Sequence, residues 1–158
     1  MNYTNQPIRR QDHLLNEEQA LDLLRNGEYG VLSMQAEEGG AYGVPINYVW
    51  DGKDCLYLHG APEGRKLRCM ALCNRVSFCV VGKTQVMAEE FTTRYESIVL
   101  KCRASTRLED EEKIQALSLL LKKYAPAHHE AGMKAAERSF PRTEIIRLEI
   151  LEMSGKCK

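Results

Sequence analysis

The stretch Cys55-Leu-Tyr-Leu-His-Gly-Ala-Pro-Glu-Gly-Arg-Lys-Leu67 joins a strand to a helix across a turn of small residues. Residues 55–60 alternate as a strand does, which places Tyr57 and His59 on one face. From residue 61 to residue 74 the apolar spacing becomes helical, and Pro62 suits a first helical turn. The stretch therefore predicts a strand at 55–60, a tight turn and a helix over 61–74.

Short strands on both sides extend this unit into a meander. Further strands are predicted at 29–35, 42–50, 76–81, 95–106 and 144–153, with an irregular segment beginning at Gly82. Pro45 indicates a sheet edge or a bulge, because proline cannot donate to a ladder. Helices are predicted at 17–26, after the capping residue Asn16, and at 109–124, with a helix or loop at 128–139. This order is typical of a single α+β domain built around an antiparallel barrel.

Composition excludes several classes of protein. The 158 residues suffice for one domain with a core, and residues 1–12 are predicted to be a polar N-terminal arm. The 22 basic and 22 acidic side chains cancel, so no net charge attracts nucleic acid or an anionic membrane. No apolar run approaches the length of a membrane span, and the six cysteines lack the spacing of a zinc site or of a disulfide framework. We expect a cytoplasmic protein with no metal site.

The turn at residues 60–64 has the features of a phosphate site. Unpaired N–H groups at a helix N-terminus carry partial positive charge, and Gly60, Ala61 and Gly64 let an anion approach the backbone. Arg65 adds a planar fork that matches phosphate oxygens, and Lys66 adds a point charge. These residues taken alone favour a solvated helix face slightly over a phosphate site.

An ordered set of short motifs resembles a known family. The motifs are Tyr29-Gly-Val-Leu-Ser33, Gly43-Val-Pro-Ile-Asn-Tyr48, Leu56-Tyr-Leu-His-Gly-Ala61, Gly64-Arg-Lys-Leu67, Asn74-Arg-Val-Ser-Phe78, Tyr95-Glu-Ser-Ile-Val99, Ile145-Ile-Arg-Leu-Glu149 and Ser154-Gly-Lys156. In this order, over roughly residues 10–156, they resemble the pyridoxamine 5′-phosphate oxidase-like split-barrel flavoproteins, most of all the nitroimidazole-resistance (Nim) branch. The resemblance implies an antiparallel split β-barrel that binds FMN, with FAD or haem as alternatives.

The resemblance also implies where the cofactor binds. It implies a homodimer with two FMN sites at the subunit interface, in which Arg65 and Lys66 match the phosphate-binding pair and Ser97 matches a polar position near the phosphate or ribityl chain. Two strands match those along the ring and ribityl chain: Val44, Pro45, Ile46 and Asn47 on one, and Tyr57, Leu58, His59, Gly60 and Ala61 on the other. The sequence departs from the family at Lys101-Cys102, where the family often has glycine.

Histidines and aromatic residues give further candidates. The resemblance places His59 beside the flavin, either as a cofactor contact or as a catalytic proton donor. His128 and His129 diverge by about 100° on a helix and are expected to face solvent. Trp50 and Tyr48 share a strand face and could contact the flavin, although packing in the core or in a dimer is the expected role.

The leading functional hypothesis is an FMN-dependent oxidoreductase. A flavin carries its own redox chemistry, so no catalytic dyad has to be visible in the sequence. In this hypothesis a nicotinamide cofactor or another donor reduces FMN, and the resemblance implies that the electrons pass to a small acceptor such as a nitroaromatic. Oxidation of pyridoxamine phosphate is disfavoured, because Arg147-Leu148 is followed by Glu149-Ile150 where that enzyme has a proline-containing motif. The alternatives are a non-catalytic flavin- or haem-binding protein and an empty interaction domain.

Overall fold

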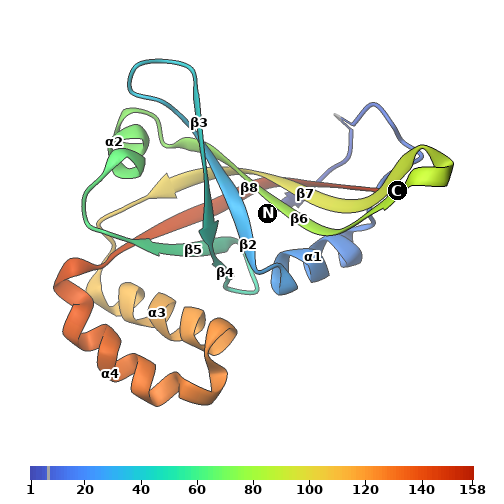
Figure 1. The fold of residues 1–158 in the computed structure, drawn as a ribbon. Coiled ribbons are helices and arrows are strands. Elements are labelled where there is room, and N and C mark those ends of the chain that lie inside the picture. Colours follow the sequence, from blue (N-terminus) through green and yellow to red (C-terminus); the bar gives the residue numbers. More distant parts are fainter. Residues whose placement is uncertain (7) are drawn as a thin grey trace.

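The computed structural model describes residues 1–6 and 8–158 and consists of one sheet with helices around it (Figure 1). The strands are β1 (Asn2–Tyr3), β2 (Tyr29–Gln35), β3 (Ala41–Asn47), β4 (Val49–Trp50), β5 (Cys55–Gly60), β6 (Arg75–Met87), β7 (Thr92–Ser105) and β8 (Glu144–Cys157). The α-helices are α1 (Glu17–Asn26), α2 (Arg65–Leu72), α3 (Asp110–Tyr124) and α4 (His129–Ser139), with short 3₁₀ turns at Ala88–Glu90, Pro126–His128 and Phe140–Arg142.

The sheet is an antiparallel split barrel to which one short parallel strand is added. Its order is β3-β2-β6-β7-β8-β5-β4, and β1 pairs with β8 in parallel. The strands at the two ends of this path, β3 and β4, are successive in the chain and are separated by Tyr48 alone. The sheet therefore wraps round until its first and last strands meet at one residue, and it does not close by hydrogen bonds between them.

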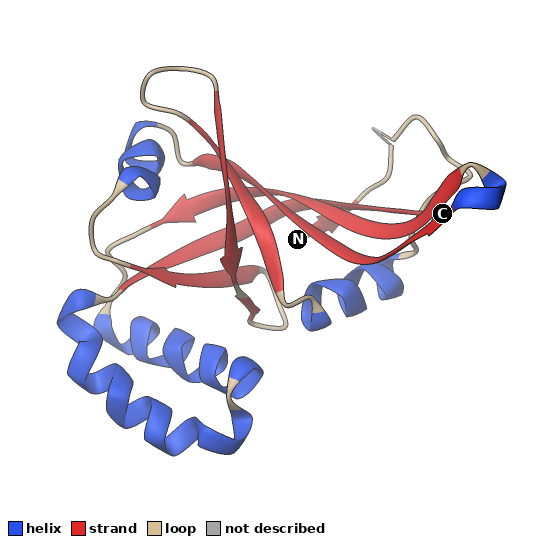
Figure 2. Cartoon of the chain, viewed as in Figure 1, coloured by secondary structure: helices blue, strands red, loops and turns tan. Residues whose placement is uncertain are grey.

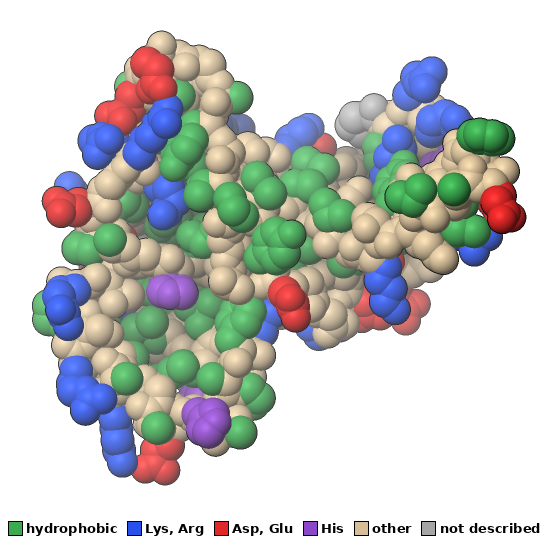
Figure 3. All heavy atoms as spheres, in the orientation of Figure 1, with side chains coloured by type: hydrophobic (Ala, Val, Ile, Leu, Met, Phe, Trp, Pro, Cys, Tyr) green, Lys and Arg blue, Asp and Glu red, His purple; other side chains and the backbone are tan. Residues whose placement is uncertain are grey.

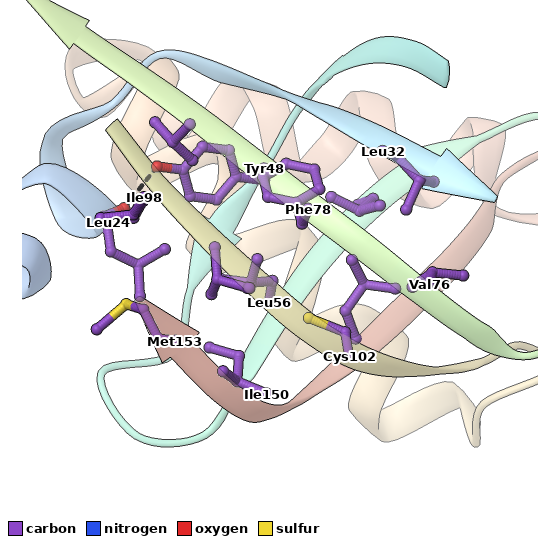
Figure 4. Close-up of a cluster of buried hydrophobic side chains, with 14 of the residues drawn as sticks. Leu24, Leu32, Tyr48, Leu56, Val76, Phe78, Ile98, Cys102, Ile150 and Met153 are labelled. Atoms are coloured by element: carbon purple, nitrogen blue, oxygen red, sulfur yellow. Dashed lines mark hydrogen bonds between the residues drawn. The ribbon is translucent and has the colours of Figure 1, made fainter. Parts of the chain in front are cut away.

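Tyr48 is the residue on which the core is centred. Its side chain is fully buried, and its ring meets Phe78 edge to face with 5.1 Å between centroids (Figure 4). Its hydroxyl donates to the carbonyl oxygen of Leu24 at 2.6 Å. That carbonyl lies in the last turn of α1, where helix carbonyls have no partner within the helix, so Tyr48 both fills the barrel and caps the helix.

Tyr124, the last residue of α3, takes the place of a strand partner at Tyr48. The backbone N–H of Tyr48 donates to the Tyr124 hydroxyl at 3.0 Å, and that hydroxyl lies 2.7 Å from the carbonyl oxygen of Tyr48. The neighbouring Lys123 places its ammonium 3.9 Å from the centre of the Tyr48 ring. Burial lowers the pKa of Lys123 to about 8, and its Nζ has no hydrogen-bond partner among the described residues. The end of α3 thus holds the backbone where β3 stops and β4 begins.

The helices cover the edges of the barrel rather than forming a second layer (Figure 2). Helix α1 has the predicted capping box, in which Asn16 and Gln19 each accept from the other's backbone N–H. Helices α3 and α4 form an antiparallel pair at one end of the sheet, and the β6–β7 hairpin projects at the other (Figure 1). Among the described residues, no helix is both long enough and apolar enough to cross a membrane.

Most predicted elements are confirmed, and Pro45 does lie on an edge strand. The extent of β6 and the start of α2 differ from the prediction. Strand β6 continues past Gly82 to Met87, with a shift in its pairing between Val81 and Thr84. Helix α2 begins at Arg65 rather than residue 61, so the segment containing Pro62 is a turn.

His129 is half-buried, with Nε2 2.9 Å from the Ser118 hydroxyl, whereas a solvent-facing ring was expected. Within the predicted N-terminal arm, Asn2 and Tyr3 form β1 and pair with β8. At the departure from the family pattern, Lys101-Cys102, strand β7 continues and its pairing with β8 shifts by one residue.

The role of Tyr48 predicts a specific loss of stability. Tyr48→Phe keeps the ring but removes the donor to Leu24, and leaving a buried carbonyl unpaired costs about 1–3 kcal/mol. The free energy of unfolding from urea titration should fall by that amount. The control Tyr29→Phe, at a tyrosine that is 58% exposed, should change it by less than about 0.5 kcal/mol. Equal stability in the two variants would contradict the role assigned to Tyr48.

Candidate functional site

The N-terminus of α2 gathers positive charge. Gly64 precedes the helix at φ +132°, a backbone conformation that side chains rarely permit, and the space where a Cβ would stand is open. The first turn then carries Arg65, Lys66 and Arg68 and no acidic residue. Positive side chains at this end interact unfavourably with the positive end of the helix dipole. A bound anion would be stabilised by the side chains and by the dipole together. This helix end therefore fits an anionic group.

Lys66 folds back toward the end of β5. Its ammonium lies 3.8 Å from the position that a Cβ on Gly60 would occupy. The absence of a side chain at Gly60 thus leaves the strand backbone open beside a fixed positive charge. The end of β5, the turn and the start of α2 converge here, with the helix starting at Arg65 rather than at the predicted residue 61.

Arg65 is held by two residues that the sequence analysis did not single out. Its guanidinium lies over the Tyr42 ring, 4.2 Å from the ring centre, and forms an ion pair with Glu38. The adjacent Glu37 pairs with Arg68 at 2.9 Å. Figure 3 shows these charges grouped over α2 and the β2–β3 turn. An incoming phosphate must compete with the Glu38 carboxylate for Arg65.

Two strand edges face the region between β3 and β5. In the described part of the chain, β3 pairs with β2 on one side, and residues 58–60 of β5 pair with β8 on one side. Each stretch therefore has a second edge whose backbone groups the sheet does not use. Leu58 is fully buried and Val44 and Ile46 pack against the core, so these residues can offer a ligand their backbone rather than their side chains.

Tyr57 and His59 lie on the same face of β5 but in different surroundings. The Tyr57 hydroxyl donates to Glu112 of α3 at 2.9 Å, and Glu112 also pairs with Arg147 of β8 at 3.0 Å. Burial first, and the bond to Glu112 second, raise the pKa of Tyr57 above its ordinary value. His59 is exposed and lines a cavity with Asn47, whose amide nitrogen donates to the carbonyl of Glu28 at 3.0 Å.

Ser97 is not brought to the cation pair within one chain. On β7, Ser97 pairs with Val81 of β6 and with Lys156 of β8. The part of β7 that lies near α2 is at Arg103, which pairs with Arg75, just after the end of that helix. Arg103 is six positions after Ser97, which corresponds to about 20 Å along the strand. The other predicted residues cluster at the ends of β3 and β5 and the start of α2, so Ser97 alone is remote from them.

A model of the pyridoxamine 5′-phosphate oxidase family matches residues 16–157. The chain belongs to this family. It is a flavin-binding family, and the split barrel described above is its fold. No curated protein sequence matches the chain significantly.

Solved structures share the fold at low sequence identity. A candidate 5-nitroimidazole antibiotic resistance protein from Bacteroides thetaiotaomicron is 20% identical with a TM-score of 0.75, covering 92% of this chain and 86% of that one. A conserved hypothetical protein from Mycobacterium tuberculosis is 15% identical with a TM-score of 0.79, covering 94% and 88%. An FAD- and haem-binding protein from Mycobacterium smegmatis is 22% identical with a TM-score of 0.72, covering 90% and 71%.

The Glu38–Arg65 pair predicts a gain of affinity on removing the carboxylate. Glu38→Gln frees the guanidinium without changing the size of the side chain, so a flavin that binds through its phosphate should bind about two- to fivefold more tightly, in line with the strength of exposed ion pairs. Quenching of flavin fluorescence measures the dissociation constant. The neighbouring Glu37→Gln, which frees Arg68 instead, is the matched control and should have the smaller effect. Weaker binding by Glu38→Gln would show that Glu38 does not compete with the phosphate.

Proposed function

We propose that this chain is an FMN-dependent oxidoreductase whose cofactor phosphate binds at the N-terminus of α2. The observation that carries the proposal is the cationic first turn of α2, with the Lys66 ammonium folded over the open backbone at Gly60. A phosphate there would accept from the free N–H groups and from Arg65 and Lys66. The single phosphate of FMN suits one helix terminus and one cation pair.

The flavin ring would lie along the unpaired edges of β3 and β5. Backbone groups from Val44 to Asn47 on one strand and from Leu58 to Ala61 on the other are available there to hydrogen-bond its edge. Asn47 and His59 stand at the ring end of this path, while Lys66 and Arg65 stand at the phosphate end. When bound, the flavin would supply the redox chemistry, and the chain would orient it and shield it from water.

A homodimer would complete the site with Ser97. A cross-strand row of small and apolar residues runs over the outer face of the sheet: Pro45, Val31, Cys79 and Val99. Val99 is 44% exposed, and Val81 beside Ser97 is 57% exposed. Hydrophobic side chains extend across this face in Figure 3. A second copy packed here would cover the apolar row and bring its own Ser97 to the interface.

Introducing charged side chains at the proposed interface should convert the dimer into a monomer. Val81→Lys combined with Val99→Lys places two ammonium groups on the apolar face of each copy, and association should be lost because those charges would be buried unpaired. Light scattering during size-exclusion chromatography measures the mass, which should fall from that of two chains to that of one. Ile114→Lys, at an exposed apolar residue of α3, is the control and should stay dimeric. A dimer that survives the double substitution would place the interface elsewhere.

The cation pair predicts a large loss of flavin affinity when it is removed. Arg65→Ala with Lys66→Ala deletes two charge-assisted contacts, each worth about 1.5 kcal/mol or more, so FMN should bind about a hundredfold more weakly. Lys134→Ala with Arg138→Ala removes the same charge from α4 and should leave the affinity unchanged. Equal affinity in the two double variants would rule out the phosphate site at α2.

Turnover separates the enzyme from a binding protein of the same fold. Under anaerobic conditions NADH or NADPH should bleach the bound flavin, and a nitroaromatic should restore its colour. Flavin that stays yellow would support a non-catalytic flavin protein instead, and a Soret band in the purified protein would support a haem protein.

A further inference from the structure

A cavity of about 320 Å³ lies between the α3–α4 pair and the open side of the sheet. Four residues of α3 line it, together with Ala136 of α4 and with Asn47 and His59 from the ends of β3 and β5. The helix pair thus supplies one wall, and the strands proposed to hold the flavin ring supply the other. Its volume is at the small end of the range for ligand pockets, about 300–1,000 Å³, which suits a molecule of one or two rings.

The lining selects an uncharged ligand. Leu117, Leu120 and Leu121 give the helical wall a hydrocarbon surface, and no Lys, Arg, Asp or Glu is among the described residues that line the cavity. A phosphate or carboxylate would lose its hydration there and would find the His59 imidazole as the one group among the described lining residues that can carry a positive charge. The space is also too small to hold a whole nicotinamide dinucleotide.

The polar groups of the cavity are concentrated on the sheet side. The Tyr124 hydroxyl is committed to the backbone of Glu28 and Tyr48, and the Asn47 amide nitrogen donates to Glu28. The Asn47 side-chain oxygen and the His59 imidazole are left to meet a ligand. A flat apolar body with one polar substituent directed at His59 satisfies this arrangement.

We infer that this cavity is the binding site for a small, uncharged aromatic substrate. That this molecule is the electron acceptor rests on the proposed flavin function, whereas its binding does not. Asn47 and His59 belong both to the cavity wall and to the strand edges assigned to the flavin ring, so an occupant would lie next to the ring. Helices α3 and α4 would then set which substrates fit, because they supply the apolar wall.

Calorimetry with two matched probes tests the inference. Nitrobenzene and 4-nitrobenzoate share a ring and a nitro group and differ by one carboxylate. Each is titrated into the oxidised, FMN-loaded protein in the absence of a reductant, so that no turnover occurs. Nitrobenzene should bind at least tenfold more tightly than 4-nitrobenzoate. Equal binding of the two probes would overturn the assignment of an uncharged ligand.

Adjacent alanines of α4 provide the variant and its control. Ala136→Phe fills the cavity and should weaken nitrobenzene binding at least tenfold, whereas Ala135→Phe projects from the exposed side of the same helix and should leave it unchanged. If Ala136→Phe does not fold, Ala136→Met fills the same space with a flexible side chain and decides the question. Unchanged nitrobenzene binding in the folded Ala136 variant would place the substrate elsewhere.

The affinity for FMN, measured alongside, separates the two proposals. Ala136→Phe should retain the FMN affinity of the unsubstituted protein. If the unsubstituted protein fails to bind FMN, the flavin function falls, and the nitrobenzene titrations repeated on that protein still decide whether the cavity binds an uncharged aromatic molecule.

Discussion

The hydroxyl of Tyr124 accepts from the backbone N–H of Tyr48 and shares its one proton between the carbonyl oxygens of Tyr48 and Glu28, and the architecture depends on this contact. Because a side chain from α3 satisfies that backbone, no neighbouring strand is required there, and the chain can turn from β3 into β4. The Tyr48 ring enters the core at the same point and its hydroxyl caps α1. One residue thus joins the two ends of the sheet, a helix end and the helix pair.

The candidate site follows from that break. In the described part of the chain, β3 and residues 58–60 of β5 each have an edge without a strand partner, and these are the edges proposed to hold the flavin ring. The turn after β5 leads directly into the cationic start of α2, so the cation pair lies at the far end of the same path. Tyr124 also lines the cavity beside His59. The contact between Tyr124 and Tyr48 therefore also positions the wall of the proposed substrate cavity.

Local patterns were sufficient to predict part of this arrangement. The alternation before Gly60 and the cations after Gly64 depend on neighbours in sequence, and the strand at 55–60 is where the sequence predicted it. The start of α2 was misplaced because Pro62 fits a first helical turn, whereas φ +132° at Gly64 cannot occur inside a helix. The far half of β6 was missed because its residues are mostly exposed and show no apolar alternation. The contacts of Tyr124 with Tyr48 and of Glu38 with Arg65 join residues distant in sequence, so no local signal reveals them.

The central claim is that the flavin lies along the unpaired edges of β3 and β5 with its phosphate at α2. Backbone amide chemical shifts, recorded by NMR while FMN is added to labelled protein, test it most directly. The account predicts that the largest changes fall on Asn47, on His59 and Gly60, and on Arg65 and Lys66. Changes confined to the β6–β7 hairpin or to α1, with these amides unmoved, would contradict it.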